Sequence, residues 1–82
     1  ICGHGEARRL IEDGDILLTG RVPTNTGGGQ LSAGRMHGYG HLFEACEQLW
    51  GRGGARQVAD ARVAGVGMGG GPLAGALLLA RE

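Results

Sequence analysis

The chain has 82 residues, which is enough for one small domain at most. Eight arginines balance eight acidic residues, so the net charge is zero and no charge excess indicates nucleic acid or a membrane surface as a partner. The 19 glycines gather in clusters separated by apolar runs, a pattern typical of a folded protein with close backbone approaches rather than of a linker.

The cysteines indicate the cellular compartment of the protein, and the first residues indicate whether the sequence is a fragment. Cys2 and Cys46 have no CxxC spacing, so they predict no disulfide framework and favour a reduced, cytoplasmic setting. No signal peptide is visible, and no apolar run reaches the length of about 18 residues that a membrane span needs. The chain begins with Ile1 and opens directly on a glycine-rich turn, which predicts a fragment of a longer protein.

The first third of the chain is expected to contain one strand. Residues 1–15 are polar and include an Asp-Gly turn signal. Residues 15–20 (DILLTG) read as a short apolar strand. Residues 21–34 are expected to form a loop, because Pro23 blocks regular pairing and the glycines permit a positive φ.

A helix is expected from about Leu42, where apolar residues begin to recur with a period of 3.6, to the stop signal at Gly51. Phe43 and Trp50 are expected to be packing residues. The apolar face is predicted to consist of Leu42, Cys46, Leu49 and Trp50, with Glu44, Glu47 and Gln48 opposite. Four arginines are expected to be solvated: Arg8, Arg9, Arg52 and Arg56.

The last third alternates polar and apolar segments. Residues 51–62 read as a polar, mobile connector, and 63–68 as a buried strand. Residues 69–72 (GGGP) are expected to turn. Residues 73–80 (LAGALLLA) favour a helix by propensity, but their length also allows a strand.

Two motif matches carry little weight. Residues 65–70 (GVGMGG) match GxGxxG, but neither a following helix and strand nor the acidic residue of a dinucleotide site follows. His37 and His41 have the i, i+4 spacing of metal ligands, and Cys2 and His4 could complete four. The two glycines between the histidines disfavour a helix there, so no metal site is predicted.

The order of the segments resembles a known family. PTNTGGGQLSAGRMHGYGHLFEA, then a helix, then VAGVGMGGGPLAGALLLAR is similar to the C-terminal end of the thiolase superfamily, in its lipid-transfer-protein and sterol-carrier branch. The opening CGHGE…IEDG fits the same branch. The resemblance covers residues 1–82 and implies an α/β fold, the C-terminal portion of a thiolase-like domain. That fold has a loop, a helix and then an antiparallel pair of strands at 63–68 and 73–80.

Two departures from the family pattern bear on the reaction. Thiolases carry Gly-His-Pro after the glycine loop, and the matching position of the histidine is Arg35 here. They also carry Cys-x-Gly in the last strand, and the position of that acid/base cysteine is Gly67. The resemblance therefore implies that standard Claisen-type acyl transfer is disfavoured.

The same branch includes aldolases that shorten steroid side chains by cleaving β-hydroxyacyl-CoA thioesters with tyrosines. The resemblance thus implies retro-aldol cleavage, with coenzyme A as part of the substrate and no other cofactor. The alternatives are an acetyl-CoA acyltransferase and a non-catalytic lipid or acyl-CoA binding protein. The predicted catalytic residues are Tyr39, His37 and His41, and the predicted substrate and oxyanion residues are Asn25, Gly28, Gly29, Gly69 and Gly70.

On this analogy the glycine loop feeds the N-terminus of a helix, where the dipole favours negative charge, and the last strand pair lines the same pocket. The family further implies a homodimer and a partner that combines an OB-fold with a zinc ribbon. Neither partner can be derived from these residues alone.

Overall fold

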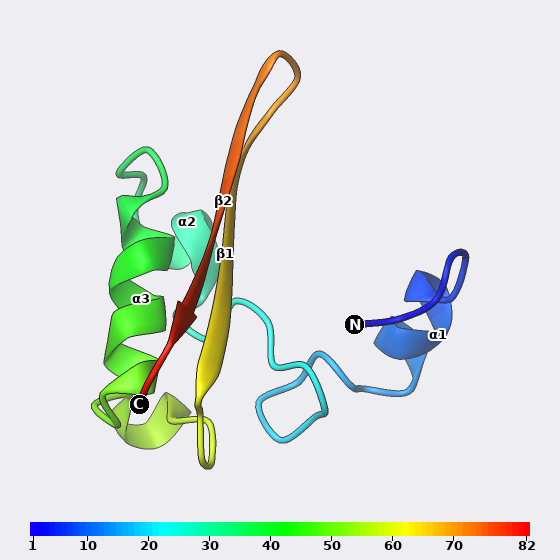
Figure 1. Cartoon of the computed structure of the whole chain (residues 1–82), viewed down its shortest axis with the longest axis horizontal. Helices are drawn as coiled ribbons and strands as arrows, with labels where there is room; N and C mark the ends of the chain where they lie inside the picture. Colours follow the sequence, from blue (N-terminus) through cyan, green and yellow to red (C-terminus); the bar gives the residue numbers. More distant parts are fainter.

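The computed structural model describes residues 1–82 and contains three α-helices, one short 3₁₀ turn and a two-stranded antiparallel sheet (Figure 1). In chain order the elements are α1 (Ala7–Glu12), α2 (Gly29–Ala33), α3 (Tyr39–Leu49), η1 (Gly54–Arg56), β1 (Val63–Gly70) and β2 (Leu73–Ala80). The predicted order of loop, helix and antiparallel strand pair is confirmed.

The strands β1 and β2 form a hairpin that is paired along its whole length, from Val63 opposite Ala80 to Gly70 opposite Leu73. The segment 73–80 is a strand despite its helix propensity, because pairing with β1 satisfies its backbone. The strand β1 runs two residues past its predicted end, so the turn contains two residues instead of the four expected at 69–72.

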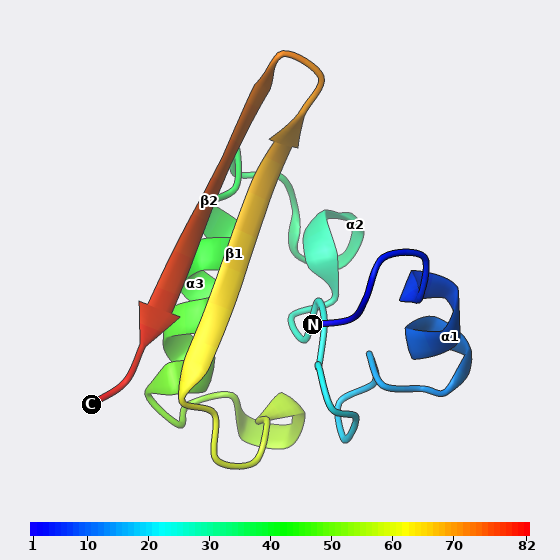
Figure 2. The same cartoon turned by 45° about the vertical axis from the view of Figure 1, so that its right-hand side comes forward.

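The helix α3 lies along the hairpin on one face (Figures 1 and 2). Ala45 and Leu49 of the helix and Val66 of β1 are the buried apolar residues of the chain. Six of the 82 residues are buried in all. A core of three apolar side chains is too small to stabilise an independent domain, so the fold needs further apolar contacts to be stable.

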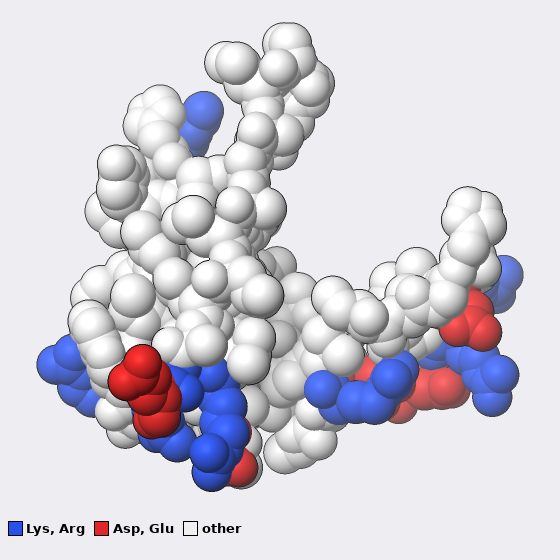
Figure 3. All heavy atoms as spheres, viewed as in Figure 1, with Lys and Arg blue, Asp and Glu red and all other residues white.

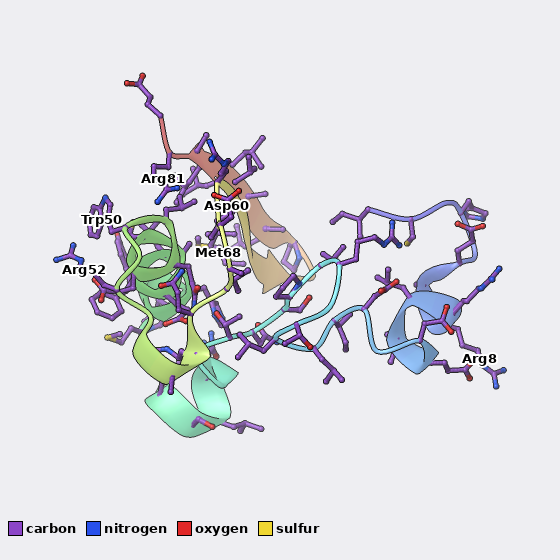
Figure 4. The ribbon with its side chains drawn as sticks, turned by 90° about the horizontal axis from the view of Figure 1, so that it is seen from below. Arg8, Trp50, Arg52, Asp60, Met68 and Arg81 are labelled. Atoms are coloured by element: carbon purple, nitrogen blue, oxygen red, sulfur yellow. The ribbon has the colours of Figure 1, made fainter.

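The loop before α3 approaches β1 closely at Gly38. This residue is buried, caps the helix with a φ of 91°, and would place a Cβ 2.5 Å from the sulfur of Met68. Figure 4 shows Met68 between the hairpin and α3. Only glycine accepts both the left-handed backbone and the contact at this position.

Three predictions about helices are corrected. The helix α3 begins at Tyr39 and not at Leu42, because the left-handed Gly38 starts it and one glycine inside a first turn costs only about 1 kcal/mol. The helix α2 lies within the predicted loop 21–34, and α1 lies within the polar segment 1–15, where no helix was predicted.

The predicted packing of the apolar face is also corrected. Phe43 and Trp50 are 60% and 59% exposed, and Cys46 is half-buried. Gln48, which was placed on the solvent face, is buried instead. The buried residues of the helix are Ala45, Gln48 and Leu49, so the buried face shares only Leu49 with the face that apolar periodicity indicated.

The predicted strand at 15–20 is wrong. The segment folds back on itself, with the Val22 N–H donating to the Asp15 carbonyl at 2.8 Å and the Thr24 N–H to the Ile16 carbonyl at 3.1 Å. No other strand lies beside it, and these local bonds satisfy its backbone instead. The first 24 residues thus form a separate arm beside the helix and hairpin (Figure 2).

Charged side chains are distributed unevenly. The hairpin, residues 63–80, carries none. Figure 3 shows most of the acidic and basic groups around the arm and at the end of the molecule away from the hairpin tip, with one basic group near the start of α3. No helix has both the length and the apolar character that crossing a bilayer requires.

Candidate functional site

The glycine loop, defined here as Asn25–Gly29, has the backbone geometry that a close approach to a ligand requires. Asn25, Gly28 and Gly29 have positive φ angles of 52°, 83° and 70°. Asparagine tolerates the left-handed region better than most residues, and glycine adopts it freely. The Gly28 N–H donates to the Asn25 carbonyl at 2.8 Å and closes a tight turn. The loop therefore presents backbone, not side chains, on its outer side.

The predicted role of a helix dipole at this loop needs correction. The loop leads into α2, which has five residues, and not into a long helix. The macrodipole of so short a helix is small, since few peptide units align. Any stabilisation of negative charge here has to come from individual N–H groups.

A carboxylate lies directly beneath the loop. Glu44 Oε1 accepts a hydrogen bond from Thr26 Oγ1 at 2.8 Å, and Glu44 Oε2 lies 2.9 Å from Arg56 Nη2. A Cβ on Gly27 would come within 3.2 Å of the same carboxylate. The Glu44 side chain is only 15% exposed, so the loop and the arginine together cover it.

Gln48 extends this polar cluster, one helical turn after Glu44. Its Nε2 donates to Glu44 Oε1 at 3.0 Å and to the Arg56 carbonyl at 2.8 Å, while its Oε1 accepts from the Val58 N–H at 2.8 Å. Gln57 Nε2 donates to the Gln48 carbonyl at 2.9 Å. The connector 51–62, predicted to be mobile, is therefore fixed to α3 by a buried amide whose polar atoms are all satisfied.

The electrostatics of the cluster favour the ionised form of Glu44. Partial burial acts to raise the pKa of this carboxyl. The hydrogen bonds from Arg56, Gln48 and Thr26, with the positive charge of Arg56, outweigh it and hold the pKa below the ordinary value of 4.5. The Glu44 carboxylate is therefore an anion that is fully engaged by donors.

The structure separates the three predicted catalytic residues. Tyr39 is the first residue of α3 and is 70% exposed. His37 precedes the helix with a φ of 50°, and its side chain is exposed. His41 lies in the first turn, with its Nε2 3.4 Å from Gln30 Nε2. No hydrogen bond joins the Tyr39 hydroxyl to either histidine, and residues two apart on a helix do not face each other.

An open groove of about 1130 Å³ runs between the glycine loop, α3, the connector and the first part of β1. Three of the predicted site residues line it: Asn25, Gly29 and His41. Five others do not: Gly28, His37, Tyr39, Gly69 and Gly70. The floor of the groove includes the Glu44 carboxylate and Gln48.

Gly69 and Gly70 lie at the end of β1 near the hairpin tip, opposite Ala74 and Leu73. A Cβ on Gly69, whose φ is 99°, would overlap the Leu73 carbonyl oxygen. Glycine at this position is therefore explained by hairpin geometry. The GxGxxG match at 65–70 does not form a dinucleotide-binding turn. These glycines lie within a strand, and an antiparallel strand follows where the motif requires a helix.

The positions of the two family departures are now visible. Gly67, at the place of the thiolase cysteine, lines the groove from β1. Arg35 is exposed, and it is the one arginine of the chain without a carboxylate partner. Neither position provides an acid or base that faces the groove.

The residues that organise the site were not predicted. Glu44 and Gln48 were placed on a solvent-facing side, and this prediction is wrong. Arg56 is exposed, as predicted, but it also pairs with Glu44. The i, i+4 spacing of Glu44 and Gln48 was the one available signal, because it puts two polar groups on one face. Their partners lie 8 to 18 residues away in the sequence, so the periodicity of the helix does not reveal these contacts.

The comparisons agree with the fold. The family model "Thiolase C-terminal domain-like" matches residues 1–79. The chain is 48% identical to 17-hydroxy-3-oxo-4-pregnene-20-carboxyl-CoA lyase of Mycobacterium tuberculosis over 50 residues, 61% of this chain and 13% of the relative. It is 46% identical to a steroid side-chain-cleaving aldolase of Thermomonospora curvata over 44 residues, 54% of this chain and 11% of the relative.

A third relative is sterol carrier protein 2 of Bos taurus, 36% identical over 76 residues, which cover 85% of this chain and 14% of the relative. No solved structure matches the chain significantly. The chain spans 11 to 14% of the length of these curated relatives. The family match over nearly every residue and the hairpin-and-helix fold lead to one conclusion: the chain belongs to the thiolase C-terminal domain-like family, in the branch of the sterol-carrier and steroid-aldolase proteins.

Proposed function

We propose that the protein containing these residues cleaves a carbon–carbon bond of a β-hydroxyacyl-CoA thioester by a retro-aldol reaction, and so shortens the side chain of a steroid or similar lipid. The observation that carries this proposal is the similarity at 48% and 46% identity to two relatives named as a lyase and an aldolase. Arg35 and Gly67 support it, because they stand where the thiolase family keeps its Claisen residues.

In the proposed reaction a base removes the proton of the β-hydroxyl, and the bond between Cα and Cβ breaks. The hydroxyl carbon becomes a carbonyl, and the bonding electrons pass to the thioester as an enolate. A proton then adds to Cα and gives a shortened acyl-CoA. No free coenzyme A, oxidant or metal ion is consumed.

The glycine loop offers two donors for the enolate oxygen. The N–H groups of Gly27 and Gly29 have no acceptor within the chain, and both residues line the groove. The Gly28 N–H is already bonded within the turn. We therefore assign the enolate to Gly27 and Gly29. Preorganised backbone donors of this kind stabilise developing negative charge without reorganising.

The proposed base is Tyr39, and His41 is the alternative. The Tyr39 hydroxyl has no hydrogen-bond partner within the chain, and its side chain is exposed at the first residue of α3, beside the residues that line the groove. His41 shares the groove with Asn25 and Gly29. A neutral His41 imidazole can take the proton of a hydroxyl within hydrogen-bond reach, and Tyr39 can do so as the phenolate, after His37 or His41 has eased its deprotonation.

A second candidate is lipid or acyl-CoA binding without turnover. The match to sterol carrier protein 2 favours it, because that match covers more of this chain than the two lyase matches do. An acetyl-CoA acyltransferase is less well supported, since neither Arg35 nor Gly67 can act as the acid or base of a Claisen condensation.

The test uses the full-length protein and a β-hydroxyacyl-CoA with a sterol-like side chain, with mass spectrometry of the released acyl-CoA. Release without added coenzyme A supports retro-aldol cleavage, and release only with coenzyme A supports thiolysis. Binding with no release supports the carrier. Comparing Tyr39→Phe, His41→Gln and His37→Gln then identifies the base among the three predicted catalytic residues.

A homodimer and an OB-fold and zinc-ribbon partner are proposals that rest on the resemblance, and a cytoplasmic location is a proposal that rests on the two free cysteines. Co-expression of the full-length protein with a candidate partner, followed by size-exclusion chromatography with light scattering, tests the first two. Fractionation of the native cells tests the third.

A further inference from the structure

The Glu44 carboxylate joins three segments that are far apart in the sequence. It accepts from Thr26 in the glycine loop, from Arg56 in the connector, and from Gln48 on its own helix. The spans to Thr26 and Arg56 are 18 and 12 residues. Both carboxylate oxygens are engaged, so Glu44 is poorly suited to exchange protons with a substrate.

We propose that Glu44 is a positioning residue that holds the glycine loop where the N–H groups of Gly27 and Gly29 meet the enolate oxygen. This inference rests on the proposed function, which assigns the enolate to those two groups. Glu44 acts through Thr26, whose hydroxyl it fixes at 2.8 Å, and through direct packing under Gly27.

The other anchors of the loop are weaker. The bond from the Gly28 N–H to the Asn25 carbonyl lies within the loop and does not fix its position on the protein. The contact between Gln30 and His41 is 3.4 Å long, beyond the usual range of a good hydrogen bond. A hydrogen bond to a charged carboxylate is roughly twice as strong as a neutral one. The bond between Thr26 and Glu44 is therefore the main link from loop to helix.

Glu44 is itself held in place. Arg56 Nε lies 3.0 Å from each of its oxygens, and Gln48 bonds both Glu44 and the Arg56 carbonyl. The carboxylate consequently has little rotational freedom. A rigid support of this kind matters for catalysis because a shift of about 1 Å in a reacting group can cost about 100-fold in rate.

The experiment compares four variants of the full-length protein: Thr26→Val, Thr26→Ser, Glu44→Gln and Glu47→Gln. Thr26→Val removes the donor and leaves the ion pair of Glu44 and Arg56 intact. Thr26→Ser keeps the hydroxyl. Glu47→Gln is the matched control, because Glu47 lies on the same helix, is similarly covered and pairs with Arg52 instead of the loop.

We expect kcat to fall by about 10- to 100-fold in Thr26→Val and Glu44→Gln, while KM changes little, because the loop acts on the enolate and not on the bound substrate. Thr26→Ser and Glu47→Gln should keep the wild-type kcat. An unchanged kcat in Thr26→Val overturns the proposal, as does an equal loss in Thr26→Ser.

Hydrogen exchange of the Gly28 amide, which is bonded to the Asn25 carbonyl within the loop, gives a readout that does not depend on activity. Exchange should be faster in Thr26→Val and Glu44→Gln than in Glu47→Gln, and equal rates overturn the positioning role. A wild-type protein that releases no acyl-CoA overturns the proposed function instead. The exchange rates then decide by themselves whether Glu44 holds the loop.

Discussion

Met68 packs directly against the backbone of Gly38: a Cβ on Gly38 would lie only 2.5 Å from the sulfur of Met68. This contact joins the start of α3 to β1 and so fixes the direction in which the first turn of the helix points. Tyr39 and His41 belong to that turn. The placement of both proposed bases thus depends on a glycine that has no chemistry of its own.

Gly38→Ala should destabilise the full-length protein by about 1–2 kcal/mol from the left-handed backbone alone. The overlap with Met68 adds to this cost, and Gly38→Ala/Met68→Ala should recover only that added part. Gly40→Ala is the matched control. Its Cβ would meet only Met36 Cε at 3.5 Å, and alanine inside a helix should stabilise by about 0.5–1 kcal/mol. Urea denaturation measures all three, and equal effects of the two alanines would contradict the argument.

The stability of the protein should depend on the ionisation of Glu44. Its pKa is lowered in the folded state, so the folded state binds this proton less tightly than the unfolded chain does. The stabilisation is therefore complete above the ordinary pKa of 4.5 and is lost as pH falls through the lowered pKa. Urea unfolding between pH 3 and 7 should show a shallower pH dependence for Glu44→Gln than for the wild type. A parallel dependence would show that Glu44 does not titrate with folding.

Gln48→Leu should be strongly destabilising although it places an apolar residue in a buried position. The Val58 N–H and the Arg56 carbonyl would lose their partner, and each unsatisfied buried group costs about 1–3 kcal/mol. Gln48→Glu keeps the acceptor but brings a second carboxyl beside Glu44. Thermal unfolding of both variants should give lower Tm values than the wild type, and a Tm for Gln48→Leu within error of the wild type would argue against the cluster.

Residues 1–82 expressed alone should not unfold cooperatively. The hairpin exposes Leu73 and Leu78 to about four-fifths of their full extent, and nothing pairs with the outer edge of β2. Exposed apolar edge strands template aggregation. Light scattering should detect association, and Leu78→Lys should reduce it. A monodisperse sample with a sharp urea transition would contradict this expectation.

The hairpin and α3 could be predicted because their signals are local. The runs at 63–68 and 73–80 predict two strands, although β1 extends two residues beyond the first run, and the family resemblance chose strand over helix for the second. The run at 15–20 carried a similar local signal, yet it forms turns. Apolar composition alone does not supply a partner strand, and a strand without a partner leaves its backbone unsatisfied.

The site could be predicted only in part, for a different reason. The positive φ angles at Asn25, Gly28 and Gly29 follow from residue type, so the shape of the loop was accessible. The support beneath it was not, because Glu44 and Arg56 look like ordinary surface residues in a sequence. Their importance comes from the way the fold brings Thr26 and the connector to the same point on α3. A pattern read over a short stretch of sequence cannot predict such contacts between distant segments.

The position of Glu44 also sets the order in which the molecule can assemble. A β-hairpin forms in about 1–10 µs and a helix faster, since both depend on neighbours in the chain. The contacts of Glu44 with Thr26 and Arg56 close loops of 18 and 12 residues. Closing these loops costs chain entropy, and only the complete set of hydrogen bonds at Glu44 offsets that cost. We therefore expect the Glu44 cluster to form after the hairpin and α3, and to open before them.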